Sequence, residues 1–190
     1  LQPMSDPRLQ QHFIDAADLL YQAADGLGPA LEAAVAALVA GLTGGGKVLV
    51  AADATCRPLA AHAAALLVGG FERARPELAA LALPEAPAPA SQVRALGQPG
   101  DVLLLLTAAP LVEDGLVAAV RAAQEREMTV VWLGGGAAGA DEAAALLRET
   151  DVALRVPHAR RARVFETHAL ALHALCDGVD IQLLGEQENP

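Results

Sequence analysis

The stretch GDVLLLLT, residues 100–107, decides the fold class. A valine and four leucines in a row are apolar on both sides of a β-strand, which is typical of a parallel sheet covered by helices on both faces. Similar short runs recur along the chain and alternate with segments of helical period. They predict five strands: Lys47–Ala52, Leu78–Leu83, Asp101–Thr107, Thr129–Gly134 and Val152–Val156. The sequence therefore predicts an α/β protein, a three-layer αβα arrangement with a doubly wound, five-stranded parallel sheet.

Helical spacing of apolar residues outlines the rest of the chain. The segment DGLGP separates two expected leading helices, because it reads as a helix stop followed by a proline-assisted start. The expected helices are Asp6–Ala24, Gly28–Leu42, Pro58–Leu67, Ser91–Leu96, Val112–Glu127, Ala140–Arg148 and a long last one from Arg160 to Leu184. No linker divides the chain. We expect one domain over 1–190, with N-terminal helices in 1–43, an α/β core in 44–158 and a C-terminal packing helix in 159–185.

Composition limits the classes of function. The chain has 190 residues, of which 54% are hydrophobic, so a full core is expected. A net charge of −10 disfavours direct binding to nucleic acid, which needs clustered Lys and Arg. The longest apolar runs are broken by Glu32, Pro110 or glycines, and no segment resembles a secretion signal. These features predict a cytoplasmic protein that does not enter the membrane.

The junction VLVAADATCRPLAAH, Val48–His62, reads as a buried strand, a turn and the start of a helix. In parallel α/β proteins such a turn commonly holds a phosphate on glycine backbone and hydroxyl groups. Here the turn contains Asp53, Thr55 and Cys56 but no glycine, and Asp53 adds negative charge where a phosphate would sit. Cys56 has two interpretations: a small buried hydrophobe, or a reactive thiol whose pKa the helix N-terminus lowers.

The order of segments resembles a known family. GGKVLV, QVRALGQPGDVLLLLT and, above all, RARVFETHALALHALCDGVDIQLL are similar to sugar isomerase (SIS) domain proteins of the phosphoheptose isomerase branch, and most similar to its DnaA initiator-associating (DiaA) members. The resemblance covers nearly the whole chain. It implies a flavodoxin- or Rossmann-like SIS domain and a tetramer in which long helices pack together.

The phosphosugar loops depart from the family pattern. The family has G-N-G-x-S after the first strand and a serine-rich loop after the third. In this chain the second loop reads TAAPLVED, where Thr107 alone is kept and Pro110 has no backbone N–H. The resemblance therefore implies a degenerate phosphosugar site at Asp53, Thr55, Cys56 and Thr107.

The catalytic positions of the family are also incomplete. Isomerases of this branch carry a glutamate four residues after a histidine, and metal-dependent members bind zinc through His, Glu, Gln and His. The chain matches these four positions with His62, Leu66, Phe165 and His173. Two imidazoles without a carboxylate make a poor zinc site, so no metal and no cofactor is expected. The relic metal or acid–base positions are His62, Glu166, His168 and His173, which can equally be packed or interface side chains.

These departures favour a non-catalytic scaffold of DiaA type over an enzyme. Such a protein would bind the replication initiator DnaA as a homo-oligomer, a tetramer, and promote initiation of chromosome replication. Two alternatives stay open. One is a phosphosugar-binding protein or a phosphoheptose isomerase acting on sedoheptulose 7-phosphate through a rebuilt site. The other is a module of the same fold that binds another metabolite or protein.

The last helix supplies a candidate docking site. It is apolar on more than one face, which predicts that the first and last helices form subunit interfaces. Leu183 and Leu184 end this helix and point about 100° apart around its axis. One of them is expected to be exposed among Asp177, Asp180 and Glu186, as an anchor for a basic partner surface. The alternative is that both leucines fill a subunit interface.

Overall fold

The computed structural model describes residues 6–109, 112–136 and 144–186. Its five strands form one parallel sheet in the order β2-β1-β3-β4-β5. The strands are β1 Val48–Ala52, β2 Ala80–Ala82, β3 Val102–Leu106, β4 Thr129–Gly135 and β5 Val152–Val156. The predicted doubly wound sheet is confirmed. Since the chain goes from β1 to β2 on one side and then to β3 on the other, the carboxyl ends of β1 and β3 form the topological switch point where ligands of such sheets bind.

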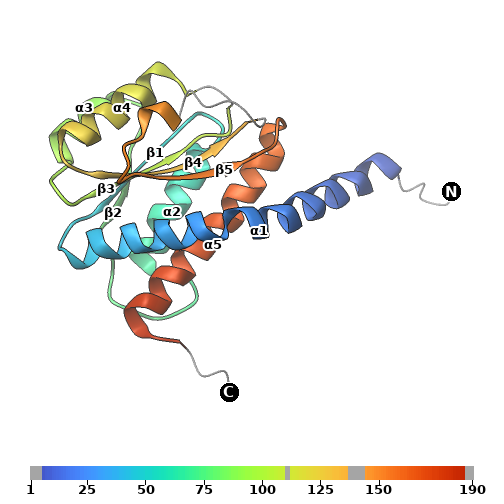
Figure 1. Cartoon of the computed structure of the whole chain (residues 1–190), viewed down its shortest axis with the longest axis horizontal. Coiled ribbons are helices and arrows are strands. Elements are labelled where there is room, and N and C mark those ends of the chain that lie inside the picture. Colours follow the sequence, from blue (N-terminus) through green and yellow to red (C-terminus); the bar gives the residue numbers. More distant parts are fainter. Residues whose placement is uncertain (1–5, 110–111, 137–143, 187–190) are drawn as a thin grey trace.

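Helices cover both faces of the sheet, as Figure 1 shows. On one face lie α3 and α4, and on the other lie α1, α2 and α5. The helices are α1 Pro7–Thr43, α2 Arg57–Gly69, α3 Pro89–Leu96, α4 Asp114–Glu125 and α5 Arg161–Leu184, with a 3-10 turn η1 Ala144–Leu146 before β5. A longer helix, Ala140–Arg148, was expected around η1, but residues 140–143 lie outside the described part of the chain, as does Pro110.

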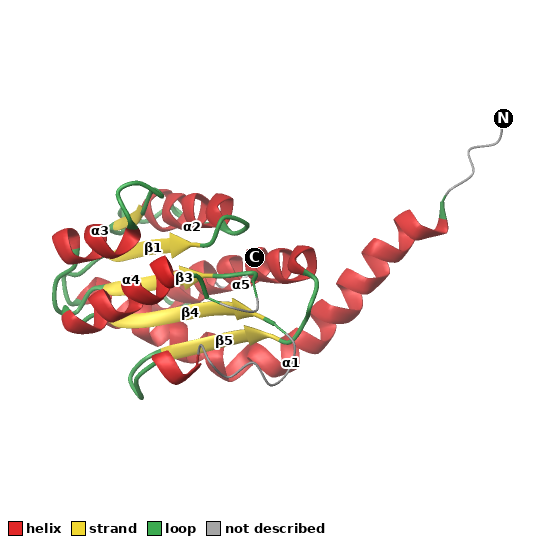
Figure 2. Ribbon diagram, turned by 90° about the horizontal axis from the view of Figure 1, so that it is seen from above, coloured by secondary structure: helices red, strands yellow, loops and turns green. Residues whose placement is uncertain are grey.

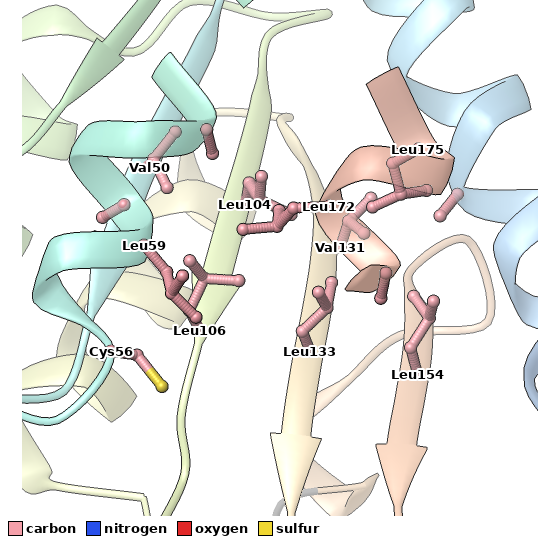
Figure 3. Packing of buried hydrophobic residues seen from close by; sticks show 14 of the residues in the cluster. Val50, Cys56, Leu59, Leu104, Leu106, Val131, Leu133, Leu154, Leu172 and Leu175 are labelled. Carbon is pink, nitrogen blue, oxygen red and sulfur yellow. The ribbon is translucent and has the colours of Figure 1, made fainter. Parts of the chain in front are cut away.

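Alternation along the strands divides the core in two. Leu104 and Leu106 pack with α1, α2 and α5, whereas Leu103 and Leu105 pack with α3 and α4. All four leucines are at most 2% exposed. Figure 3 shows the first of these clusters, with Leu172 and other α5 side chains against the strands. The run of four leucines is thus explained by burial on both faces of a central strand.

The N-terminal segment forms one helix of 37 residues, so the prediction of two helices broken at DGLGP is wrong. Pro29 lies inside α1, where it removes one backbone hydrogen bond. The buried stripe runs past it from Leu27 to Ala34 without a change of face, and packing on α5 outweighs the lost bond. Gly178 of α5 permits this close approach, because a Cβ there would lie 2.7 Å from Val35 Cγ2.

The N-terminal half of α1 extends beyond the body of the protein, as Figure 2 shows. Its exposed apolar side chains include Leu9, Phe13, Ile14 and Tyr21. By length and composition α1 could cross a membrane. This was not predicted, because two shorter helices were expected in its place. Core helices of soluble proteins pass the same test, and α1 packs along α5 and β5.

Candidate functional site

Two loops meet at the carboxyl ends of β1 and β3. The Asp53 carboxylate joins them: its Oδ1 accepts the backbone N–H of Cys56 at 2.8 Å, and its Oδ2 accepts those of Ala108 at 2.7 Å and Ala109 at 3.1 Å. Asp53 is only 3% exposed. The prediction placed this carboxylate facing a ligand, but the structure turns it inward onto the backbone.

Cys56 and His168 form a buried contact beside Asp53. The Cys56 Sγ lies 3.9 Å from His168 Nδ1, and His168 Nε2 lies 3.3 Å from the Gly134 carbonyl oxygen. A carbonyl can only accept, so Nε2 carries the proton and the thiol donates to Nδ1. Figure 3 shows the Cys56 sulfur at the start of α2, next to the core leucines.

Burial keeps both of these groups neutral. Desolvation, together with the smaller effect of the Asp53 charge, raises the pKa of the Cys56 thiol to about 12. Desolvation likewise lowers the pKa of His168 to about 4. The idea of a reactive Cys56 with a lowered pKa is therefore wrong, because loss of water outweighs the dipole of α2. Cys176 is also buried, and burial raises its pKa to about 12.

Thr107 has a structural role. Its side chain is fully buried, and its Oγ1 accepts the indole N–H of Trp132 at 2.9 Å. Thr55 lies in the turn before α2 and is partly exposed. Of the four positions predicted for the degenerate phosphosugar site, three are buried and only Thr55 has direct access to solvent.

His62 on α2 and His173 on α5 form an accessible imidazole pair. Their Nε2 atoms are 2.9 Å apart, so one ring donates and the other accepts. Phe71 stacks on His173 with ring centroids 5.1 Å apart, which fixes that imidazole. Sequence reasoning missed Phe71, because its contact depends on the turn after α2 and follows no local pattern.

The resemblance implies a zinc site at these histidines, and the residues present do not fit one. His62 and Leu66 stand one helical turn apart on α2, and Phe165 and His173 lie on α5. Leucine and phenylalanine side chains offer no lone pair, and the two imidazoles bond to each other. Within residues 6–109, 112–136 and 144–186, no three His, Cys, Asp or Glu side chains gather in a way that could hold a metal.

Glu166 and His168 do not act as a pair. Glu166 Oε1 accepts from the Arg163 guanidinium at 2.6 Å, whereas His168 faces Cys56 and Gly134. Arg163 also donates to the backbone carbonyl of His12 on α1. Arg163 thus links α1 to the start of α5 and pairs with Glu166. Glu166 therefore does not form an acid–base pair with His168.

The end of α5 differs from the predicted docking surface in one respect. Leu183 packs against the core cluster and Leu184 is 43% exposed, so one leucine points in and one out. Asp180, however, is fully buried, and its Oδ1 pairs with Arg75 Nε at 2.5 Å. Asp180 therefore cannot belong to a ring of exposed carboxylates around Leu184.

Comparison with known proteins identifies the family. No protein-family model matches the chain. A phosphoheptose isomerase of Methylibium petroleiphilum is 46% identical over 199 aligned residues, which cover 97% of this chain and 98% of that protein. Another, of Aromatoleum aromaticum, is 38% identical and covers 95% of this chain and 97% of that protein. The chain belongs to the phosphoheptose isomerase family.

Solved structures give the same result. The phosphoheptose isomerase GmhA of Neisseria gonorrhoeae superimposes with a TM-score of 0.82 at 34% identity, covering 92% of this chain and 97% of that one. That of Francisella tularensis has a TM-score of 0.84 at 32% identity, with the same coverage of both chains. The sugar isomerase domain of an RpiR transcription factor, at 18% identity and a TM-score of 0.66, shares the SIS fold.

These relatives correct the functional expectation. A non-catalytic scaffold for DnaA is contradicted, because the similar full-length proteins are named as enzymes and not as replication factors. The expectation relied on the altered phosphosugar loops and on Leu66 and Phe165, which replace the catalytic glutamate and the glutamine of the resemblance. These local departures were given more weight than the similarity along the whole chain.

Proposed function

We propose that this protein is a sugar-phosphate isomerase that interconverts an aldose and a ketose, with sedoheptulose 7-phosphate as its substrate. The observation that carries the proposal is the 46% identity, along nearly the full length of both chains, to a phosphoheptose isomerase. The accessible His62–His173 pair supports it, because aldose–ketose isomerisation needs a base and an acid close together.

In this proposal the imidazole pair performs the proton transfers. One ring, as base, takes the proton from the carbon next to the carbonyl, while the other donates a proton to the carbonyl oxygen. Return of a proton to the former carbonyl carbon, with loss of the hydroxyl proton from its neighbour, completes the reaction without net proton uptake. The substrate has to replace the Nε2–Nε2 bond, since that bond occupies both reactive nitrogens. No step requires a metal.

Solvent exchange tests this proposal directly. We expect the purified protein to incorporate deuterium from D2O at the carbon next to the carbonyl of sedoheptulose 7-phosphate, as seen by NMR. His62→Ala and His173→Ala should each lower the rate by about 100-fold or more, in the range of general acid–base catalysis. Arg121→Ala, at an exposed position of α4 on the other face of the sheet, is the control and should change the rate little. Absence of exchange in the wild-type protein would contradict the proposal.

We also propose that the active protein is a homotetramer assembled through α1 and α5. The extended half of α1 exposes Phe13 and Tyr21 at 79% and 83%, and α5 exposes Leu170 at 51%. Apolar hollows of about 370 and 740 Å³ lie along the α1–α5 pair. Exposed apolar surface of this extent is typical of subunit contacts. Sedimentation should give four times the 19.4 kDa of the chain, and Phe13→Asp should dissociate the assembly.

A further inference from the structure

The carboxylate of Asp53 is held as a bound anion would be. Three backbone N–H groups point at its two oxygens over 2.7–3.1 Å, one from the start of α2 and two from the loop after β3. Convergent backbone N–H groups of this kind are the usual means by which proteins hold oxyanions. Here the anion belongs to the protein.

The carboxylate is not neutralised by a cation. Asp53 makes no ion pair with any side chain in the described ranges, although it is 3% exposed. Its neighbours Cys56 and His168 are both uncharged near pH 7, since burial moves both pKa values away from that pH. The three backbone N–H groups therefore stabilise the buried negative charge of Asp53, as they would stabilise a bound oxyanion.

We propose that Asp53 is an internal oxyanion that fills the anion site between the β1 and β3 loops, so that these three N–H groups are closed to external ligands. Removal of the carboxylate opens a site for a small oxyanion such as formate. The consequence for the isomerase is that the phosphate of a sugar phosphate is bound by other groups. The proposal itself does not depend on isomerase activity.

Chemical rescue tests it. Asp53→Ala keeps the Cβ and deletes only the carboxylate, which leaves a space with the shape of formate. We expect sodium formate to raise the Tm of Asp53→Ala in a saturable way, by about 3–6 °C at ten times its Kd. The comparison uses sodium chloride at equal ionic strength, because general salt effects shift Tm without binding.

Asp53→Asn is the matched control. Its amide fills the same space, so formate should shift its Tm no more than chloride does, and the wild-type protein should behave in the same way. Saturable formate stabilisation confined to Asp53→Ala supports the proposal. Equal effects of formate and chloride on that variant overturn it.

Hydrogen exchange on the wild-type protein gives a second test that needs no variant to fold. Inorganic phosphate should leave the exchange of peptides containing Cys56, Ala108 and Ala109 unchanged, since their N–H groups already have an acceptor. Protection of these peptides by phosphate overturns the proposal. Sedoheptulose 7-phosphate turnover is measured separately, so failure of the isomerase proposal and failure of the internal anion are distinguishable.

Discussion

The two ends of the sheet stabilise buried carboxylates in different ways. At the amino end, Asp101 precedes β3 and is 1% exposed, and its Oδ2 lies 2.6 Å from Lys47 Nζ. Asp151 precedes β5 and pairs with Arg148 at 3.6 Å. At the carboxyl end, Asp53 is buried to a similar degree and is held by three backbone N–H groups, with no cation paired to it among the described residues.

The difference follows from what each end does. At the amino end the cations neutralise the carboxylates, so neither is left as an uncompensated buried charge. At the carboxyl end the loops after β1 and β3 meet at the switch point, where a ligand is expected. A cation beside Asp53 would occupy that space. Backbone dipoles stabilise the charge there without a cationic side chain.

Deletion of the Asp53 side chain should give the largest effect. Asp53→Ala leaves the N–H groups of Ala108 and Ala109 without an acceptor, and leaves that of Cys56 with only the backbone carbonyl of residue 53 at 3.1 Å. We expect it to lower the free energy of unfolding by about 3–5 kcal/mol. Denaturant unfolding measures this loss. Asp53→Asn keeps one acceptor oxygen and should cost less, about 1–2 kcal/mol. Equal costs for the two variants would contradict this ranking, because they would show that neither the shape of the Asn side chain nor its one acceptor oxygen holds the loops.

Most of the fold, but not the continuity of α1, was predictable from the sequence. The five strands were predicted because apolar runs such as VLLLL indicate strands that are buried on both faces. The helices between them were predicted from the helical spacing of apolar residues. The continuity of α1 was missed because Gly28 and Pro29 favour a break locally, whereas packing on α5 decides the outcome.

The candidate site was less accessible to sequence reasoning. His62 and His173 were singled out by a resemblance, but their direct contact depends on how α5 crosses α2. The role of Asp53 depends on the N–H groups of Ala108 and Ala109. Nearly every residue type has the same backbone N–H, so the sequence does not indicate which of them bind a side chain. Burial of Cys56 likewise arises from tertiary packing, which overrode the expected effect of the helix N-terminus.

The pH dependence of stability should come from the carboxyl end through His168. Its pKa is lowered to about 4 by burial, so between about pH 6.5 and pH 4 the unfolded chain binds a proton that the folded chain excludes. Stability is therefore full above pH 6.5 and falls as the pH decreases, by about 3 kcal/mol in total. His168→Gln should flatten this part of the profile in denaturant unfolding. An unchanged profile would assign the loss to other groups.

Removal of the cation at the amino end should have a smaller effect. Lys47→Met keeps the length of the side chain but leaves the Asp101 carboxylate with only the backbone N–H groups of Lys47 and Gln98, each at 2.8 Å. That arrangement is close to the one at Asp53, so the carboxylate stays partly satisfied. We expect a loss of about 2 kcal/mol in urea unfolding. Arg126→Met, at an exposed guanidinium, is the control and should cost little.

The smallest effect concerns Cys56. Because its pKa is about 12 and its thiol donates to His168 within the core, it should not react with a thiol reagent at pH 8 in the folded protein. Burial is the largest cause of the raised pKa, so Asp53→Asn, which removes the neighbouring charge, should leave the thiol slow to react. Guanidinium should expose both cysteines and give two equivalents per chain. Rapid labelling of native Cys56 would mean that the carboxyl end opens to solvent and that its internal contacts are weaker than those at the amino end.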